Sequence, residues 1–253
     1  MGIVAIPAVI VLFLAMGVKY PPTERAAAGI STGEMFGELR NPMFLVLFLS
    51  MFLTAASELA PGQWVDLALS RTVGMPGILL LVYVSGLMFL MRQFAGPLVH
   101  KLSPIGVLWF SCLGAALGLV ALSYANSPVM GLLAATLWGT GVCYMWPTML
   151  ATSSERFPRG GALLMGLMGT AGTLSIQFVL PMMGSIYDTK KIELAGGEAA
   201  FNSLQGDALN TVLGAAAQAS FRAVAILPAL LLVVFGAIWL YDRRSGGYKV
   251  TKI

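Results

Sequence analysis

Residues 102–154 form a stretch without a single Asp, Glu, Lys or Arg, and this stretch constrains the fold more than any other feature of the sequence. A helix needs about 20 apolar residues to cross the hydrocarbon core of a bilayer, so the stretch is too long for one crossing. Its middle holds the polar, proline-containing segment SYANSP at residues 123–128, which is typical of a turn. The stretch therefore predicts a hairpin of two membrane-spanning helices.

The rest of the chain repeats this alternation of apolar stretches and short polar clusters. Of the 253 residues, 58% are hydrophobic and 10% are charged, whereas soluble domains average about 25% charged residues. We therefore expect an all-α membrane protein embedded in the lipid bilayer, with about seven transmembrane helices. The expected spans are residues 2–18, 43–65, 76–98, 103–123, 128–150, 161–186 and 221–241.

The basic residues predict the orientation of these spans. One set of alternate loops holds ten of the 15 Lys and Arg residues and the other set holds three. The first set is Lys19, Arg25, Arg40, Lys101, Arg156, Arg159, Arg243, Arg244, Lys249 and Lys252, and the second is Arg71, Lys190 and Lys191. Cytoplasmic loops are enriched in such residues, so the N-terminus is expected outside and the C-terminus in the cytoplasm. The basic residues form no patch that would suit nucleic acid, and the short loops favour a prokaryotic inner membrane.

Two connections carry helical signals of their own. Residues 19–41 mix Pro, Gly, Ser and balanced charge, as a linker between bundles does, with a short surface helix expected near 33–39. The long connection at 188–220 contains DALNTVLGAAAQASFR, whose small residues have helical propensity. This segment either extends the last helix outward or lies at the membrane interface.

Glu58 is the first candidate functional residue. It follows seventeen uncharged residues that begin at Asn41, which places it about 25 Å along a helix and in the outer half of the second span. An acid inside a span is costly, because insertion scales give about 2.5–3.5 kcal/mol for Asp at mid-helix. Pro61 and Gly62 follow, so we expect a break in the helix that frees carbonyls toward a cavity. Glu58 is thus interpreted as a protonatable or substrate-binding acid beside a gating kink; the alternative is an acid solvated at the outer interface.

Several further polar and aromatic residues are candidates for contacting a solute. Gln63 and Trp64 would hydrogen-bond and stack with a sugar-like solute, although Trp is also enriched at membrane interfaces. In the fifth span Trp138, Tyr144 and Trp146 surround glycines and precede Pro147, where they would form the floor or gate of a site or would pack in the core.

Arg92 and Gln177 are open to two interpretations each. Arg92 either snorkels to the cytoplasmic side or pairs with a carboxylate across the bundle, and Gln177 either binds a ligand or hydrogen-bonds a neighbouring helix. Small residues at four-residue spacing, such as Gly114 with Gly118, favour close approach of helix backbones. Cys112 and Cys143 are interpreted as apolar packing residues.

The sequence offers no sign of an enzyme. It contains no phosphate-binding loop, no Ser-His-Asp set and no metal-ligand cluster, and its one histidine, His100, is expected in a loop. An exposed histidine explains His100 as simply as a proton sensor does. We expect no catalytic residue, no metal and no cofactor.

Four short patterns together resemble the major facilitator superfamily (MFS), specifically its sixth helix, its central cytoplasmic loop and its helices seven to twelve. They are FAGPLVHKLSP at 94–104, ERFPRGGA at 155–162, PMMGSIYD at 181–188 and SELAPGQW at 57–64. The first occupies the place of the superfamily's loop motif between helices eight and nine, and the second resembles the turn between helices ten and eleven. The third resembles the outer end of helix eleven. The fourth resembles the Glu-x-x-x-Gly pattern of helix seven in fucose-type sugar/proton symporters.

The loop motif also departs from the superfamily's pattern. Gly96 and Pro97 form its expected turn, but His100 stands where the motif has an acid and Lys101 stands at its first basic position. The resemblance covers nearly the whole chain, yet five of the twelve helices of a complete member have no counterpart in it.

The resemblance implies a division of the chain and a function. Residues 1–18 would be helix six, 19–41 the inter-bundle loop, 42–241 the C-terminal six-helix bundle and 242–253 a cytoplasmic tail. The chain would be a secondary transporter, or half of one, that moves a small polar solute, favoured to be a sugar, with protons coupled through Glu58. It would need an N-terminal half-transporter or a second copy of itself as a partner. The alternative is a truncated or scaffold-like membrane protein that assembles without moving solute.

Overall fold

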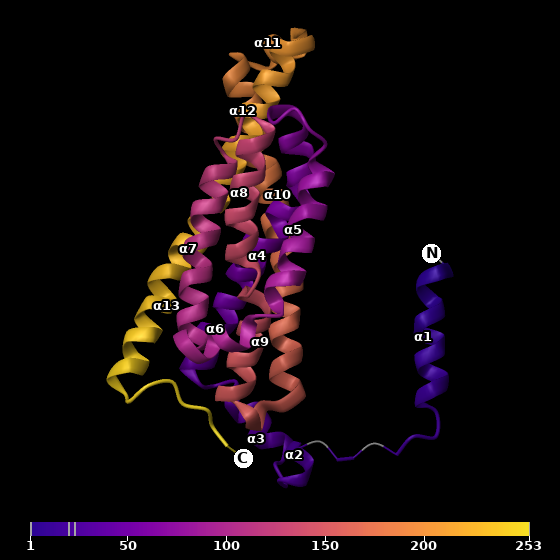
Figure 1. Ribbon diagram of the computed structural model, residues 1–253, viewed down its shortest axis with the longest axis vertical. Helices are drawn as coiled ribbons and strands as arrows, with labels where there is room; N and C mark the ends of the chain where they lie inside the picture. Colours follow the sequence, from indigo (N-terminus) through magenta and orange to yellow (C-terminus); the bar gives the residue numbers. More distant parts are fainter. Residues whose placement is uncertain (1, 20, 23, 253) are drawn as a thin grey trace.

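A computed structural model shows a bundle of long helices, with one helix standing apart from it (Figure 1). The structure describes every residue except 1, 20, 23 and 253, and the side chains of 2–5, 8, 24–25, 65–69 and 71–72 also lie outside the description. The helices are α1 (Gly2–Ala15), α2 (Glu24–Ala27), α3 (Thr32–Glu38), α4 (Pro42–Thr72), α5 (Gly77–Arg92), α6 (Ala95–Leu102), α7 (Pro104–Leu122), α8 (Pro128–Val142), α9 (Met145–Arg156), α10 (Gly161–Ala195), α11 (Glu198–Ser203), α12 (Gly206–Val224) and α13 (Ile226–Arg244), with a 3-10 turn at Pro158–Gly160.

The expected all-α membrane protein is confirmed. Five helical segments are long and apolar enough to cross a membrane, or six if the bent pair of α5 and α6 counts as one span. These six correspond to the second through seventh expected spans. The first expected span is the 14-residue α1, which is shorter than the ~20 residues of a typical crossing, so its role as a span stays a prediction.

Proline positions explain where the helices of the bundle are interrupted. The α5–α6, α8–α9 and α12–α13 breaks each lie three or four residues before a proline, at Pro97, Pro147 and Pro228. A proline inside a helix cannot donate to the carbonyl four residues earlier, and its ring crowds that carbonyl. The bend between α5 and α6 is 66°. In contrast, α4 continues through Pro61 and Gly62 to Thr72, so the break that we expected there is absent.

The two connections with helical signals also form helices. Residues 32–38 form α3, and Ser31 and Glu34 close a capping box at its start. Residues 206–224 form α12, which packs against α10 and leads into α13. The segment therefore extends the last helix outward, and the upper end of the bundle in Figure 1 consists of α11 and the ends of α10 and α12.

The α7–α8 hairpin is the most tightly packed part of the bundle. A Cβ on Gly118 would collide with the backbone of Trp138, and a Cβ on Gly141 would collide with the backbone of Gly114 and Ala115. The small residues thus allow the two backbones to touch, as helices do in lipid. The hairpin predicted from the uncharged stretch is the structural core, with Cys112 fully buried in it.

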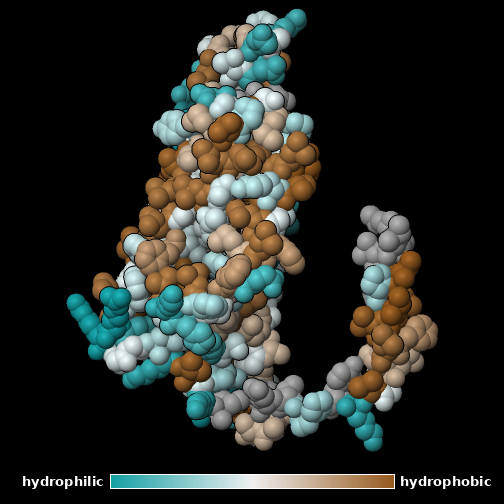
Figure 2. All heavy atoms as spheres, viewed as in Figure 1, coloured by the Kyte–Doolittle hydropathy of each residue, from teal (hydrophilic) through white to brown (hydrophobic). Residues whose placement is uncertain are grey.

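The outer surface has the polarity of a membrane protein. Figure 2 shows hydrophobic side chains over the middle of the bundle and hydrophilic side chains at its two ends. The lower end in this view comprises α2, α3, the end of α9, the end of α13 and the C-terminus. We call it the basic end, because Arg156, Arg159, Arg243, Arg244 and Lys249 belong to it. Arg25 and Arg71, which the orientation count used, have side chains outside the described part.

The α7–α8 contact predicts a sharp difference between two glycine substitutions. Gly141→Ala inserts a methyl group into touching backbones and should lower the free energy of unfolding by about 1–3 kcal/mol. Gly166→Ala in α10 is the control, because nothing lies within 4 Å of its added Cβ. Thermal unfolding in detergent, followed by circular dichroism, measures both. Equal midpoints for the two variants would contradict the packing described here.

Candidate functional site

Glu58 lies near the middle of the 31-residue helix α4. The part of α4 that is apolar enough to cross a membrane is Pro42–Trp64, so Glu58 lies in the half of the span nearer Trp64, away from the basic end, as the sequence predicted. The Glu58 side chain is 15% exposed, and its Oε1 lies 3.9 Å from Nη2 of Arg92. Its Oε2 is buried and has no hydrogen-bond partner among the described residues. A buried carboxylate oxygen without a partner is costly and is thus a candidate for binding a proton or a polar ligand.

Arg92 joins Glu58 to the broken helix pair α8–α9. It is the last residue of α5, and its Nε donates a hydrogen bond of 3.2 Å to the carbonyl of Cys143. Cys143 lies four residues before Pro147, so this carbonyl is the one that Pro147 leaves without its helical donor. The structure therefore supports the pairing interpretation of Arg92. Arg92 contacts a carboxylate on one side and a proline-freed carbonyl on the other.

Pro61 creates a second freed carbonyl in the same way. The residue four positions earlier is Ser57, and its carbonyl accepts a hydrogen bond of 3.2 Å from the indole Nε1 of Trp138 in α8. The sequence predicted freed carbonyls at Pro61 that would face a cavity. Instead, the freed carbonyl accepts a hydrogen bond from a side chain of a neighbouring helix. Trp138 is 3% exposed, so it is a buried tie between α4 and α8 and does not line an open pocket.

A cavity of about 250 Å³ opens beside Arg92. Its lining comes from α5, α6, α7 and α9 and includes Arg92, Tyr144, Pro147, Thr148 and Glu155. The hydroxyl of Tyr144 donates to the carbonyl of Met91 at 2.6 Å, which fixes the ring at the edge of this cavity. The cavity brings a guanidinium and a carboxylate to a largely apolar wall, but it is smaller than the about 300–1,000 Å³ of typical small-ligand sites.

The other predicted solute-binding residues lie away from Glu58. Trp64 packs edge-on against Tyr187 of α10, with ring centroids 5.2 Å apart. Trp146 is partly buried and lies so close to Gly172 of α10 that a Cβ there would collide with it. Gln63 and Gln177 are exposed on the outer surface of the bundle. These residues do not form one site with Glu58 inside the bundle.

The residues of the expected loop motif are helical. Gly96, Pro97, His100 and Lys101 all belong to α6, so the predicted Gly-Pro turn and the loop position of His100 are wrong. The reason is that Pro97 falls in the first turn of a helix, where its missing N–H is not needed. The chain turns instead at residues 93–94 and at Ser103, whose φ is +64°.

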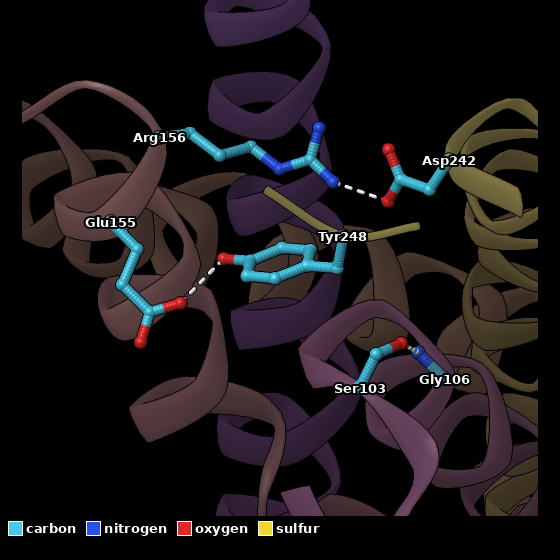
Figure 3. Close-up of polar contacts among 6 residues, drawn as sticks. All are labelled: Ser103, Gly106, Glu155, Arg156, Asp242 and Tyr248. Atoms are coloured by element: carbon cyan, nitrogen blue, oxygen red, sulfur yellow. Dashed lines mark hydrogen bonds and ion pairs between the residues drawn. The ribbon is translucent and has the colours of Figure 1, made fainter. Parts of the chain in front are cut away.

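A second polar network lies at the basic end (Figure 3). Arg156 of α9 forms a largely buried ion pair with Asp242 of α13. The hydroxyl of Tyr248 donates to Glu155 at 2.6 Å, and its ring lies 4.8 Å from the guanidinium of Arg156. The C-terminal tail is thereby attached to α9. Sequence reasoning missed Asp242 and Tyr248; the signal was an acid directly before two arginines at the end of an apolar helix.

No cofactor site is evident in the part of the chain that the structure describes. It contains no group of three or more His, Cys, Asp or Glu side chains that could hold a metal ion. Cys112 and Cys143 are buried free thiols. Glu58 and Arg92 are thus the ionisable pair that lies beside the two freed carbonyls.

Comparison with known proteins gives one result. A family model described as Major Facilitator Superfamily matches residues 1–179. Searches of curated proteins and of solved structures give no significant match. The matched residues include α4 to α9 and therefore Glu58, Arg92, Trp138 and both prolines.

The proline-freed carbonyl of Ser57 predicts a measurable coupling between Trp138 and Pro61. Trp138→Phe leaves this carbonyl without a donor and should cost about 1–3 kcal/mol of unfolding free energy beyond the loss of packing. In a Pro61→Ala background the restored amide donates to Ser57, so the same substitution should cost less. A double-mutant cycle from denaturant unfolding in detergent measures the difference. Equal costs in both backgrounds would contradict the hydrogen bond.

The tail attachment predicts an effect of removing one hydroxyl group. Tyr248→Phe should speed hydrogen exchange at the Thr251 amide, which donates to the Glu155 carbonyl at 2.9 Å. Tyr241→Phe, an exposed tyrosine of α13, is the control and should leave this exchange unchanged.

The same attachment has a pH dependence with a defined sign. Burial, and then the hydrogen bond to Glu155, raise the pKa of Tyr248 above its usual 10.0. A raised pKa in the folded state stabilises the docked tail at all pH values below that of a free tyrosine. This stabilisation should be lost only as the pH rises through the raised pKa. Thr251 exchange, corrected for its intrinsic pH dependence, should therefore stay slow through neutral pH.

Proposed function

Because the chain belongs to the major facilitator superfamily, a family of membrane transporters, we propose that it moves a small polar solute across the membrane by alternating access, coupled to protons through Glu58. The observation that carries the proposal is the Glu58 carboxylate. It lies within the membrane-spanning part of α4, six residues before its end at Trp64, with one oxygen unpaired and the other 3.9 Å from Arg92. Ionisable residues inside spans are costly and mark ion or proton pathways.

The mechanism follows from the contacts of Arg92. With Glu58 charged, the guanidinium is attracted both to this carboxylate and to the Cys143 carbonyl at the α8–α9 break. A proton on Glu58 removes the first attraction and frees Arg92 to move. Protonation thereby acts on the joint between α5, α8 and α9, which is the place where these helices can change their angle.

A second bundle is part of the proposal. Transporters of this family place the solute between two repeats, and this chain would supply the C-terminal six-helix bundle, residues 42–241, with α1 as helix six. The exposed polar residues Gln63, Thr170, Thr173 and Gln177 on α4 and α10 suit a surface that faces such a partner. The partner would be an N-terminal half-transporter or a second copy of this chain. The solute class, a sugar, rests on the resemblance of residues 57–64 to helix seven of fucose-type symporters.

Orientation and location complete the proposal. The enrichment of Lys and Arg at the basic end supports a cytoplasmic location for that end. The tail, residues 242–253, and the linker, residues 19–41, would then be cytoplasmic. The membrane would be a prokaryotic inner membrane.

A second candidate function is a scaffold that assembles without transport. The position of α1 favours it, because this helix stands apart in Figure 1 and exposes Val11, Leu12, Phe13 and Leu14. An apolar helix of this kind needs another surface to cover it, whether or not solute moves. Transport measurements decide between the two candidates.

The test is solute flux in proteoliposomes that contain the wild-type chain, alone or with a supplied N-terminal half, against a panel of sugars. Glu58→Gln keeps the shape of the side chain but stays uncharged. It should lower proton-driven accumulation of solute tenfold or more. Exchange of labelled for unlabelled solute should continue, because exchange requires no net release of the proton.

The matched control is Glu193→Gln, which removes an exposed acid at the far end of α10. It should accumulate solute as the wild type does. Accumulation by Glu58→Gln at the wild-type level would contradict proton coupling through this residue. Correctly folded wild type that moves no member of the panel, with and without the supplied half, would favour the scaffold.

A further inference from the structure

A pocket at the basic end is separate from the Glu58 site. Its volume is about 400 Å³, and it lies between the end of α6, the outer face of α7, the end of α13 and the tail. Cavities that bind small ligands have volumes of about 300–1,000 Å³, so it is large enough to hold one. Its lining is His100, Lys101, Leu102, Ser103, Phe110, Trp239, Asp242, Arg243, Gly247 and Tyr248.

The charge of the pocket favours an anion. Lys101 and Arg243 contribute two positive charges, and His100 lies beside them. Asp242 is the acidic member of the lining, but it is 5% exposed and forms an ion pair with Arg156 on its other side. Its negative charge is thus neutralised by an arginine outside the pocket. The two exposed cations therefore have no acid within the lining that is free to pair with them.

The walls of the pocket combine this charge with aromatic rings. The guanidinium of Arg243 lies 4.4 Å from the ring centroid of Trp239, which holds the cation over an aromatic face. Trp239 in turn packs against Phe110, with ring centroids 6.1 Å apart. The Ser103 hydroxyl accepts a hydrogen bond from the Gly106 amide (Figure 3) and caps α7 at the rim.

The position of the pocket indicates where its anion comes from. It lies where the apolar outer faces of α7 and α13 end, and the exposed side chain of Phe110 forms part of its lining. Figure 2 shows hydrophilic side chains gathered over the lower end of α13, directly below hydrophobic ones. A ligand held there would have its phosphate among cations and its apolar part along the helices. Basic pockets at the ends of transmembrane helices bind anionic lipid headgroups in this way.

We propose that this pocket binds the phosphate of an anionic phospholipid headgroup, held by Lys101 and Arg243, with the acyl chains lying along α7 and α13. The lipid would contact α6, α7, α13 and the tail directly. Asp242 of the pocket lining would connect it to α9, because Asp242 pairs with Arg156. Occupancy would therefore stabilise the basic end. The proposal is independent of the solute and of proton coupling, because none of its residues contacts Glu58 or Arg92.

The experiment is native mass spectrometry of the full chain with phosphatidylglycerol or phosphatidylcholine of identical acyl chains. The wild type should retain the anionic lipid preferentially. Lys101→Gln/Arg243→Gln should reduce that preference by about fivefold for each cation removed. Lys101→Arg/Arg243→Lys, which keeps both charges, should retain it.

The matched control is Lys249→Gln/Lys252→Gln, which removes two exposed cations from the same end of the molecule but outside the pocket lining. This variant should retain phosphatidylglycerol as the wild type does. Equal retention by the wild type and the pocket variant, or an equal loss in the tail variant, would overturn the proposal.

A second arm separates a lipid from a soluble phosphate. Glycerol 3-phosphate, added at the concentration of the lipid, should leave bound phosphatidylglycerol in place, because it lacks the acyl chains that contact α7 and α13. Displacement of the lipid by this compound would show that the pocket takes a soluble phosphate, and the lipid assignment would be wrong.

Discussion

The need to satisfy backbone carbonyls in a medium without water determines how this bundle is connected. Each proline within a membrane helix leaves one carbonyl without its helical donor, and an unsatisfied polar group in hydrocarbon costs several kcal/mol. The carbonyl freed by Pro61 receives the indole of Trp138, and the carbonyl freed by Pro147 receives the guanidinium of Arg92. Sequence alone would assign Trp138 to packing and Arg92 to snorkelling. Both side chains instead form hydrogen bonds that link neighbouring helices.

This arrangement gives Glu58 an influence beyond its own helix. Arg92 cannot move toward or away from Glu58 without changing its contact with the Cys143 carbonyl, which lies between α8 and α9. A change in the charge of Glu58 on α4 therefore alters the contact of Arg92 with the break between α8 and α9. The tight α7–α8 contact keeps α8 in place, because Gly114 and Gly141 bring the two backbones together. We expect α9, rather than α8, to respond.

The sequence predicted the class of fold and most of its elements because long uncharged stretches and their polar interruptions are direct signals of membrane helices. It also singled out Glu58 and Pro61 on local grounds. It could not predict the partners of those groups. The carbonyl of Ser57 and the indole of Trp138 are 81 residues apart, and pairings across helices have no local signal. The missing break at Pro61 has the same cause. The carbonyl that Pro61 frees finds a donor on a neighbouring helix, so α4 need not open there, and the sequence around Pro61 does not reveal that donor.

The most direct test of this account is the distance across the α8–α9 break in the two charge states of Glu58. Spin labels at Met130 and Ser154, both exposed, would report this distance by pulsed electron paramagnetic resonance in nanodiscs, with Cys112 and Cys143 replaced by alanine. We predict that Glu58→Gln shifts the distance distribution relative to the wild type, and that Glu193→Gln does not. Identical distributions for Glu58→Gln and the wild type, at every pH and with solute present, would contradict the link between Glu58, Arg92 and the break.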